Sequence, residues 1–116
     1  MTAEFGAHAG RRTDDAGQDP VVVHVSGELD IQHADKLEGL LAAALASAEP
    51  STAIIVDLSN SSFCDSSGLN VLIRAREAGL RTGHTLSLAA PNHQMLRLLD
   101  LTGTAPLFPV GPAVAG

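Results

Sequence analysis

The chain has 116 residues, of which 45% are hydrophobic and 17% charged, and it contains one Cys and no Trp or Tyr. This length and composition predict a single soluble globular domain with an aliphatic core, and they exclude a disulfide framework and a second domain. The formal net charge of −6, with no run of Lys or Arg, argues against nucleic acid or an anionic membrane as the partner and favours a protein.

The N-terminal part of the chain predicts two strands and a helix. Residues 1–19 are small, polar and turn-rich, and we expect a weak edge strand followed by a loop. The β-branched residues 21–29 predict a buried strand. Apolar residues recur at spacings of three and four between Ile31 and Pro50, which predicts a helix with Asp30 at its N-cap.

The rest of the chain continues the alternation of strands and helices. In chain order, we expect a strand over residues 52–59, a polar loop, a helix after Gly68 that ends near Gly79 to Gly83, a strand over 84–90, a helix over 91–103, and a Pro-rich tail over 105–116 with one short strand near Leu107. This alternation predicts an α/β fold in which helices cover a sheet, with residues 1–116 as one domain and residues 20–104 as its core.

The tetrapeptide Asp65-Ser66-Ser67-Gly68 stands where the second long strand meets a helix. Loops after the C-terminal ends of strands are favoured places for function. Ser66 fits two compatible roles: its hydroxyl can cap the helix, or it can accept a phosphoryl group that the helix N-terminus would stabilise. Gly68 would let another backbone approach closely. Ser67 stays open as a second, minor acceptor.

Two carboxylates are predicted beside this loop. Asp30 and Asp65 each follow a strand and precede a helix, so each is also a candidate N-cap. If the two strands are neighbours, both carboxylates lie on one rim beside Ser66. A phosphate about 5 Å from a carboxylate is repelled by about 1.7 kcal/mol at the dielectric constant of water. Phosphorylation could therefore eject a partner without unfolding the domain.

The sequence offers little for catalysis or metal binding. It contains no G-x-S-x-G elbow, P-loop or dinucleotide fingerprint. Cys64 has no Cys partner at a ligand spacing and is expected to be a small buried residue. The histidines are scattered singly, at His8, His24, His33, His84 and His93. We therefore expect no enzyme activity, no metal ion and no cofactor bound by this chain.

No segment predicts secretion or membrane insertion. The longest apolar runs, such as residues 40–46, fall far short of the roughly 20 residues that a spanning helix needs. Residues 1–17 lack the basic start and apolar block of a secretory signal. We expect a cytoplasmic protein that does not insert directly into a membrane.

Three motifs taken together resemble the STAS domain of bacterial anti-sigma factor antagonists. They are "VSGELD" before an amphipathic helix, "IIVDLSNSSFCDSSGLNVLIRA", and "MLRLLDLTG" after a further strand. The resemblance covers roughly Val21 to Thr104 in the family's order of elements. It implies a single STAS domain: a small mixed sheet of about four to five strands with helices packed mainly on one face.

The resemblance also implies a function by partner switching. In the unphosphorylated state such a protein binds an anti-sigma factor that is also a serine kinase, and the sigma factor is released. The kinase, which binds ATP and Mg²⁺, phosphorylates the serine that corresponds to Ser66, and a PP2C-type phosphatase reverses the reaction. Asp30, Asp65, Ser67 and Gly68 match the family's partner-binding positions.

Some residues depart from the family pattern, and other functions remain open. Cys64 stands where a bulkier aliphatic residue is common, Asn70 stands where Gly is frequent, and many members carry a further helix at the C-terminus. One alternative is a STAS adaptor subunit of a membrane transporter or a stress-sensing complex. Another is a STAS domain that binds a small molecule.

Overall fold

A computed structural model of the chain describes residues 5–11 and 20–114, and within them a five-stranded sheet runs in the order β1-β2-β3-β4-β5. Its strands are β1 (Gly6–Arg11), β2 (Val21–Leu29), β3 (Ile54–Cys64), β4 (Leu86–Ala89) and β5 (Val110–Gly111). Strand β1 is antiparallel to β2, and every other neighbouring pair is parallel. The sheet is therefore mixed, as predicted, and the weak edge strand near the N-terminus is present.

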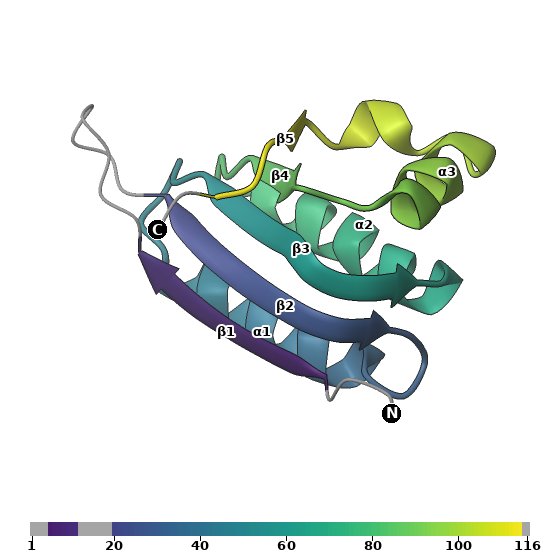
Figure 1. Ribbon diagram of the computed structural model, residues 1–116. Coiled ribbons are helices and arrows are strands. Elements are labelled where there is room, and N and C mark those ends of the chain that lie inside the picture. Colours follow the sequence, from purple (N-terminus) through teal and green to yellow (C-terminus); the bar gives the residue numbers. More distant parts are fainter. Residues whose placement is uncertain (1–4, 12–19, 115–116) are drawn as a thin grey trace.

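Helices cover one face of this sheet. The described residues contain α1 (Ala34–Ser47), α2 (Ser66–Leu80), α3 (His93–Leu101) and a short 3-10 helix, η1 (Ala105–Leu107), and the layer on this face consists of α1 and α2. In Figure 1, α1 and α2 lie side by side behind the sheet, whereas α3 lies apart from them near the C-terminal part of β3. The predicted α/β fold, with helices mainly on one face, is confirmed.

The core lies between the sheet and the α1–α2 layer, and its side chains are aliphatic, as the composition predicts. Alternate residues of β2 and β3, such as Val23 and Val56, point into this layer and are fully buried. Leu37 and Leu41 of α1 and Val71 of α2 meet them from the other side. Each buried Leu or Val side chain contributes about 1.5–3 kcal/mol, so this layer fixes both helices on the sheet. Within the described residues, no helix is long and apolar enough to cross a membrane.

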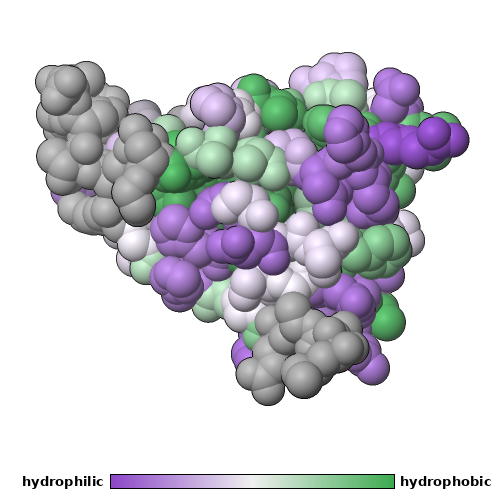
Figure 2. All heavy atoms as spheres, viewed as in Figure 1, coloured by the Kyte–Doolittle hydropathy of each residue, from purple (hydrophilic) through white to green (hydrophobic). Residues whose placement is uncertain are grey.

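The opposite face of the sheet carries a row of polar side chains. His8 on β1 stacks on His24 of β2 with ring centroids 4.9 Å apart, and His24 Nδ1 donates to Asp57 Oδ2 on β3 at 2.7 Å. Ser59 donates to the other oxygen of Asp57 from both its backbone N–H and its hydroxyl. Figure 2 shows hydrophilic residues gathered over the β1–β2 part of this face.

Strand β3 is longer than predicted. The polar residues 60–62 belong to the strand and not to a loop, because Asn60 and Ser61 pair with Ser26 and Gly27 of β2, between two irregularities in register. The hydroxyl of Ser61 is buried and donates to the backbone oxygen of Gly27 at 3.0 Å. Pairing of the backbone outweighs the local preference of these polar residues for a loop.

The start of α1 and the tail also differ from the prediction. Helix α1 begins at Ala34 and not near Ile31, and residues 31–33 form a turn between β2 and the helix. In the tail, the short strand falls at 110–111, and Leu107 ends a 3-10 helix instead. Pro106 occupies the first turn of that helix, where its fixed φ is favourable and its missing N–H is not needed.

Candidate functional site

The loop between β3 and α2 is built around the side chain of Asp65. Asp65 is the N-cap of α2, and its Oδ1 accepts hydrogen bonds from the backbone N–H groups of Ser67 at 2.8 Å and Gly68 at 3.2 Å. Ser66 is the first residue of the helix and is exposed. The interpretation of Ser66 as the cap is therefore wrong, and the cap interpretation of Asp65 is confirmed. Asp65 already takes two of the helix N–H groups that were expected to stabilise a phosphate.

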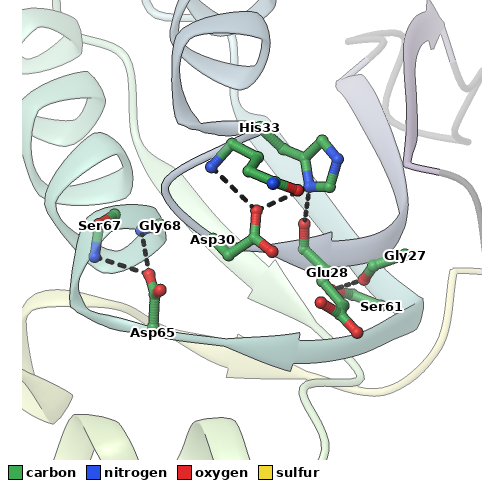
Figure 3. Close-up of polar contacts among 9 residues, drawn as sticks. Gly27, Glu28, Asp30, His33, Ser61, Asp65, Ser67 and Gly68 are labelled. Carbon is green, nitrogen blue, oxygen red and sulfur yellow. Dashed lines mark hydrogen bonds and ion pairs between the residues drawn. The ribbon is translucent and has the colours of Figure 1, made fainter. Parts of the chain in front are cut away.

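Asp30 and Asp65 lie on the same rim of the sheet. They follow the last residues of two neighbouring parallel strands, since Leu29 of β2 pairs with Cys64 of β3. The backbone N–H of Asp65 donates to the backbone oxygen of Leu29 at 3.0 Å. Figure 3 shows the two loops side by side, with the Asp30 turn on one and the Asp65 cap on the other. The predicted rim is confirmed.

Gly68 brings the start of α2 against the end of β2. A Cβ atom at this position would lie 2.6 Å from the backbone oxygen of Leu29 and 2.8 Å from its Cβ, and 3.1 Å from Cys64 Sγ. The predicted close backbone approach at Gly68 is therefore confirmed. It places the Ser66 turn directly against the residue that precedes Asp30.

The role of Asp30 differs from its prediction as a helix cap. Its Oδ1 accepts the backbone N–H of Gln32 at 3.1 Å and lies 2.8 Å from Nδ1 of His33. His33 itself occupies the N-cap position of α1. Because α1 starts three residues later than expected, the carboxylate of Asp30 stabilises the turn between β2 and α1 and does not reach the helix N–H groups.

Sequence reasoning missed two residues that hold the other side of the loop. Gln94, near the start of α3, accepts the backbone N–H of Cys64 at 2.9 Å and donates to the backbone oxygen of Cys64 at 2.6 Å. Asn92 caps α3 by accepting the N–H of Met95 and also donates to the backbone oxygen of Ser62. The cap could have been found from Asn92 after Pro91, but nothing local indicates that either side chain reaches β3.

Cys64 lies behind the loop and is buried, as predicted. Burial, together with the negative charge of Asp65, raises the pKa of its thiol to about 12. The thiol therefore stays protonated at neutral pH and is a poor nucleophile. In residues 5–11 and 20–114, no three His, Cys, Asp or Glu side chains are grouped to hold a metal ion.

Two large apolar side chains flank the acidic rim. Ile31 follows Asp30 and is 74% exposed, and Phe63 precedes Cys64 and is 40% exposed. The site thus combines two carboxylates, an exposed serine hydroxyl and two exposed apolar side chains. Such a combination suits the binding of a protein surface better than the binding of a small polar substrate.

The sheet order, the helix layer and the rim between β2 and β3 together define a STAS domain. The STAS family described as "Mlab, STAS domain" matches residues 13–109, and the chain belongs to this family. No curated protein sequence matches the chain significantly.

Three solved structures place the chain among proteins of this fold. An anti-sigma factor antagonist from Mycobacterium paratuberculosis is 29% identical, with a TM-score of 0.77 over 98% of this chain and 92% of the other. The phosphorylated form of SpoIIAA, a Bacillus cell fate determinant, is 19% identical, with a TM-score of 0.66 over 96% and 92%. The murine anion transporter Slc26a9 is 15% identical, with a TM-score of 0.76 over 97% of this chain and 21% of the transporter.

Proposed function

We propose that this protein is an anti-sigma factor antagonist controlled by phosphorylation of Ser66. In its unphosphorylated form it binds an anti-sigma factor that is also a serine kinase, and the sigma factor is released. Phosphorylation of Ser66 abolishes this binding. Family membership and the antagonist from Mycobacterium paratuberculosis support the general function.

The observation that carries the proposal is that Asp65, and not Ser66, caps helix α2, so that the Ser66 hydroxyl is left exposed. Asp65 accepts the helix N–H groups, so the capping role does not account for Ser66. The serine is exposed at the first position of α2, on the rim that also holds Asp30. A partner can therefore reach its hydroxyl without any part of the domain unfolding.

A phosphate at this position would change the surface that the partner meets. It carries about −1.5 to −2 charges at pH 7 and would stand beside two carboxylates. The N–H groups of Ser67 and Gly68 are already bonded to Asp65, so they do not neutralise the phosphate. A partner shaped to a neutral hydroxyl would have to desolvate an unpaired dianion, which is costly. Binding should therefore weaken without loss of the fold.

The other roles in the cycle belong to partner proteins. The kinase holds ATP and Mg²⁺, a PP2C-type phosphatase removes the phosphate, and this chain acts as substrate and regulator and not as an enzyme. Asp30, Asp65 and Ser67 form its kinase-facing surface together with Ser66, and Gly68, which is buried, supports this surface by holding the start of α2 against β2. We place the cycle in the cytoplasm, where the sigma factor acts.

The test is a titration of the purified kinase with the wild-type protein, Ser66→Asp and Ser47→Asp. We expect Ser66→Asp to raise the Kd at least tenfold, which corresponds to about 1.4 kcal/mol. Ser47, at the opposite end of α1, gains the same charge away from the rim and should leave the Kd within about twofold. Affinity capture from native lysate on wild-type and Ser66→Asp baits identifies the kinase beforehand.

A second arm measures phosphate transfer. Incubation with the kinase and ATP should label the wild-type protein and leave Ser66→Ala unlabelled, while Ser66→Ala still binds the kinase. Full labelling of Ser66→Ala, or equal affinity of the wild-type and Ser66→Asp proteins for the kinase, would contradict the proposal.

A transporter adaptor is the second candidate function. The similarity to the part of Slc26a9 that this chain matches supports it, and so does a similarity to a sulfate transporter family protein from Wolinella succinogenes, with a TM-score of 0.64. Recovery of transporter subunits in equal amounts on the wild-type and Ser66→Asp baits would favour this function, because an adaptor has no need of the Ser66 switch.

A further inference from the structure

We propose that His33 is a positioning residue for Asp30 on the rim that the partner meets. This inference rests on the proposed function for its effect on the partner, but its structural part concerns this chain alone. His33 would act through the orientation of the Asp30 carboxylate and would not itself touch the phosphoryl group.

The ring of His33 is held by two acceptors on the preceding turn. Its Nδ1 lies 2.9 Å from the backbone oxygen of Glu28 and 2.8 Å from Oδ1 of Asp30 (Figure 3). The backbone oxygen of Glu28 can only accept a hydrogen bond, so Nδ1 carries the proton and donates to it, and Oδ1 of Asp30 lies in close contact with the same N–H group.

The start of α1 gives up a side-chain cap to make this arrangement. His33 stands at the N-cap position, yet among the described residues α1 has no capping hydrogen bond from a side chain. Asp30, which could provide one, instead accepts the N–H of Gln32 and lies 2.8 Å from Nδ1 of His33. Loss of a side-chain cap typically lowers the folding equilibrium constant about two- to thirtyfold. In this turn the Asp30 carboxylate and the His33 ring hold each other in place.

One face of the His33 ring is also covered. Phe5, just before β1, stacks on it with ring centroids 4.6 Å apart and planes inclined by only 4°. Phe5 and the backbone of Glu28 therefore fix the plane of the ring. Oδ1 of Asp30 accepts the Gln32 N–H and lies against His33 Nδ1, so a donor from a partner would meet its Oδ2.

Asp30 lies one residue from the backbone that contacts the Ser66 loop. The preceding residue, Leu29, accepts the N–H of Asp65 and packs against Gly68. A change in the Asp30 turn therefore occurs next to the acceptor loop. We infer that a fixed carboxylate at Asp30 lets the partner bind without first ordering this side chain, an ordering that would cost about three- to tenfold in affinity.

Two substitutions separate the ring from its donor. His33→Phe keeps an aromatic ring that can stack on Phe5 but loses the Nδ1 proton. His33→Asn loses the ring, while its side-chain amide donates from nearly the position of Nδ1. If His33 acts by positioning Asp30, the Asn variant should behave like the wild-type protein and the Phe variant should not.

The first readout needs no partner. Solvent exchange of the Gln32 amide, measured by NMR, reports whether Asp30 Oδ1 is held, because that N–H donates to it. We expect exchange in His33→Phe to be several-fold faster, about as fast as in Asp30→Ala, and exchange in His33→Asn to match the wild type. Unchanged exchange in His33→Phe would overturn the proposal. Equally fast exchange in both His33 variants would also overturn it, since the donor that His33→Asn keeps would then not be enough to hold Asp30.

The second readout is the Kd for the kinase. His33→Phe should raise it about three- to tenfold, while His33→Asn should stay within about twofold of the wild type. Faster Gln32 exchange with an unchanged Kd would overturn the link between Asp30 and the partner. If the wild-type protein itself binds no kinase, the proposed function fails, and the Gln32 exchange rates alone then support or overturn the positioning of Asp30.

Discussion

Gly68 is the residue at which helix α2 comes closest to strand β2. A methyl group there would press on the backbone oxygen and Cβ of Leu29, and neither can move without shifting the strand. The residue is needed for space, because it lies inside α2 and its φ is not in the left-handed region. A larger side chain would push the Ser66 turn away from the rim.

We predict that Gly68→Ala destabilises the protein by about 1–3 kcal/mol, the usual cost of overpacking. Urea denaturation gives the free energy of unfolding. The control is Gly39→Ala, on the exposed face of α1, where an added Cβ meets nothing within 4 Å. That change should stabilise by about 0.5–1 kcal/mol because Ala favours a helix. A Gly68→Ala protein as stable as the wild type would contradict the close approach.

At the scale of elements, α3 completes the edge of β3. Strand β4 pairs with Ile54 to Asp57 of β3. Beyond that point the side chains of Asn92 and Gln94 form hydrogen bonds with backbone groups of β3. The amide of Gln94 offers both a donor and an acceptor, as a neighbouring strand would. Helix α3 thus fixes the backbone of Cys64, the residue directly before the Asp65 cap.

Replacement of Gln94 by Leu should therefore cost about 1–3 kcal/mol, since two backbone groups of Cys64 lose their partner. His93→Leu, at the exposed neighbouring position, is the matched control and should change stability by less than about 0.5 kcal/mol. Unfolding monitored by circular dichroism compares the two. Equal stability of both variants would show that α3 is held by its apolar face alone.

For the whole molecule, the buried carboxyl of Asp57 links stability to pH. Burial raises its pKa, but the hydrogen bonds from the hydroxyl and backbone of Ser59 and the contact with His24 more than offset this. The pKa of Asp57 therefore lies below its usual 3.8 in the folded state. The ionised form is favoured by folding, so Asp57 contributes stability above pH 3.8, and this contribution is lost as the pH falls through the lowered value.

Asp57→Asn should accordingly be less stable than the wild type at pH 7, and the difference should narrow as the pH falls below 3.8. Urea titrations at a series of pH values measure this difference in the free energy of unfolding. Glu38→Gln breaks an ion pair with Arg74 whose side chains are both half exposed, and it should change stability by less than about 1 kcal/mol at any pH. A difference for Asp57→Asn that stays constant down to low pH would contradict the lowered pKa.

Much of the fold follows from local patterns in the sequence. The β-branched run from Val21 and the apolar spacing after Gly68 predict a strand and a helix that the structure contains. Where polar residues lie inside an element, the local pattern fails: residues 60–62 are a strand because β2 offers them backbone partners. Such pairing depends on residues more than thirty positions away.

The candidate site divides in the same way. Asp65, Ser66 and Gly68 could be identified from the sequence, because a helix that follows a strand needs an N-cap residue, and because Gly lets another backbone approach closely. Which residue caps the helix, however, was decided by geometry: Ser66 and Asp65 were both candidates, and Asp65 is the cap. His33 and Gln94 could not be identified, since their partners, Asp30 and Cys64, are set by a turn and by a helix docked from elsewhere.

The sequence by itself therefore determined the order of the elements, the aliphatic core and the Asp-Ser-Ser-Gly turn, since these depend on interactions between near neighbours. Only the tertiary structure decided the register that brings Asp30 beside Asp65, and the contacts that hold the loop from both sides. The reason is physical: a register is chosen by the whole buried face of the sheet, and a side-chain hydrogen bond forms only where that choice places its partner.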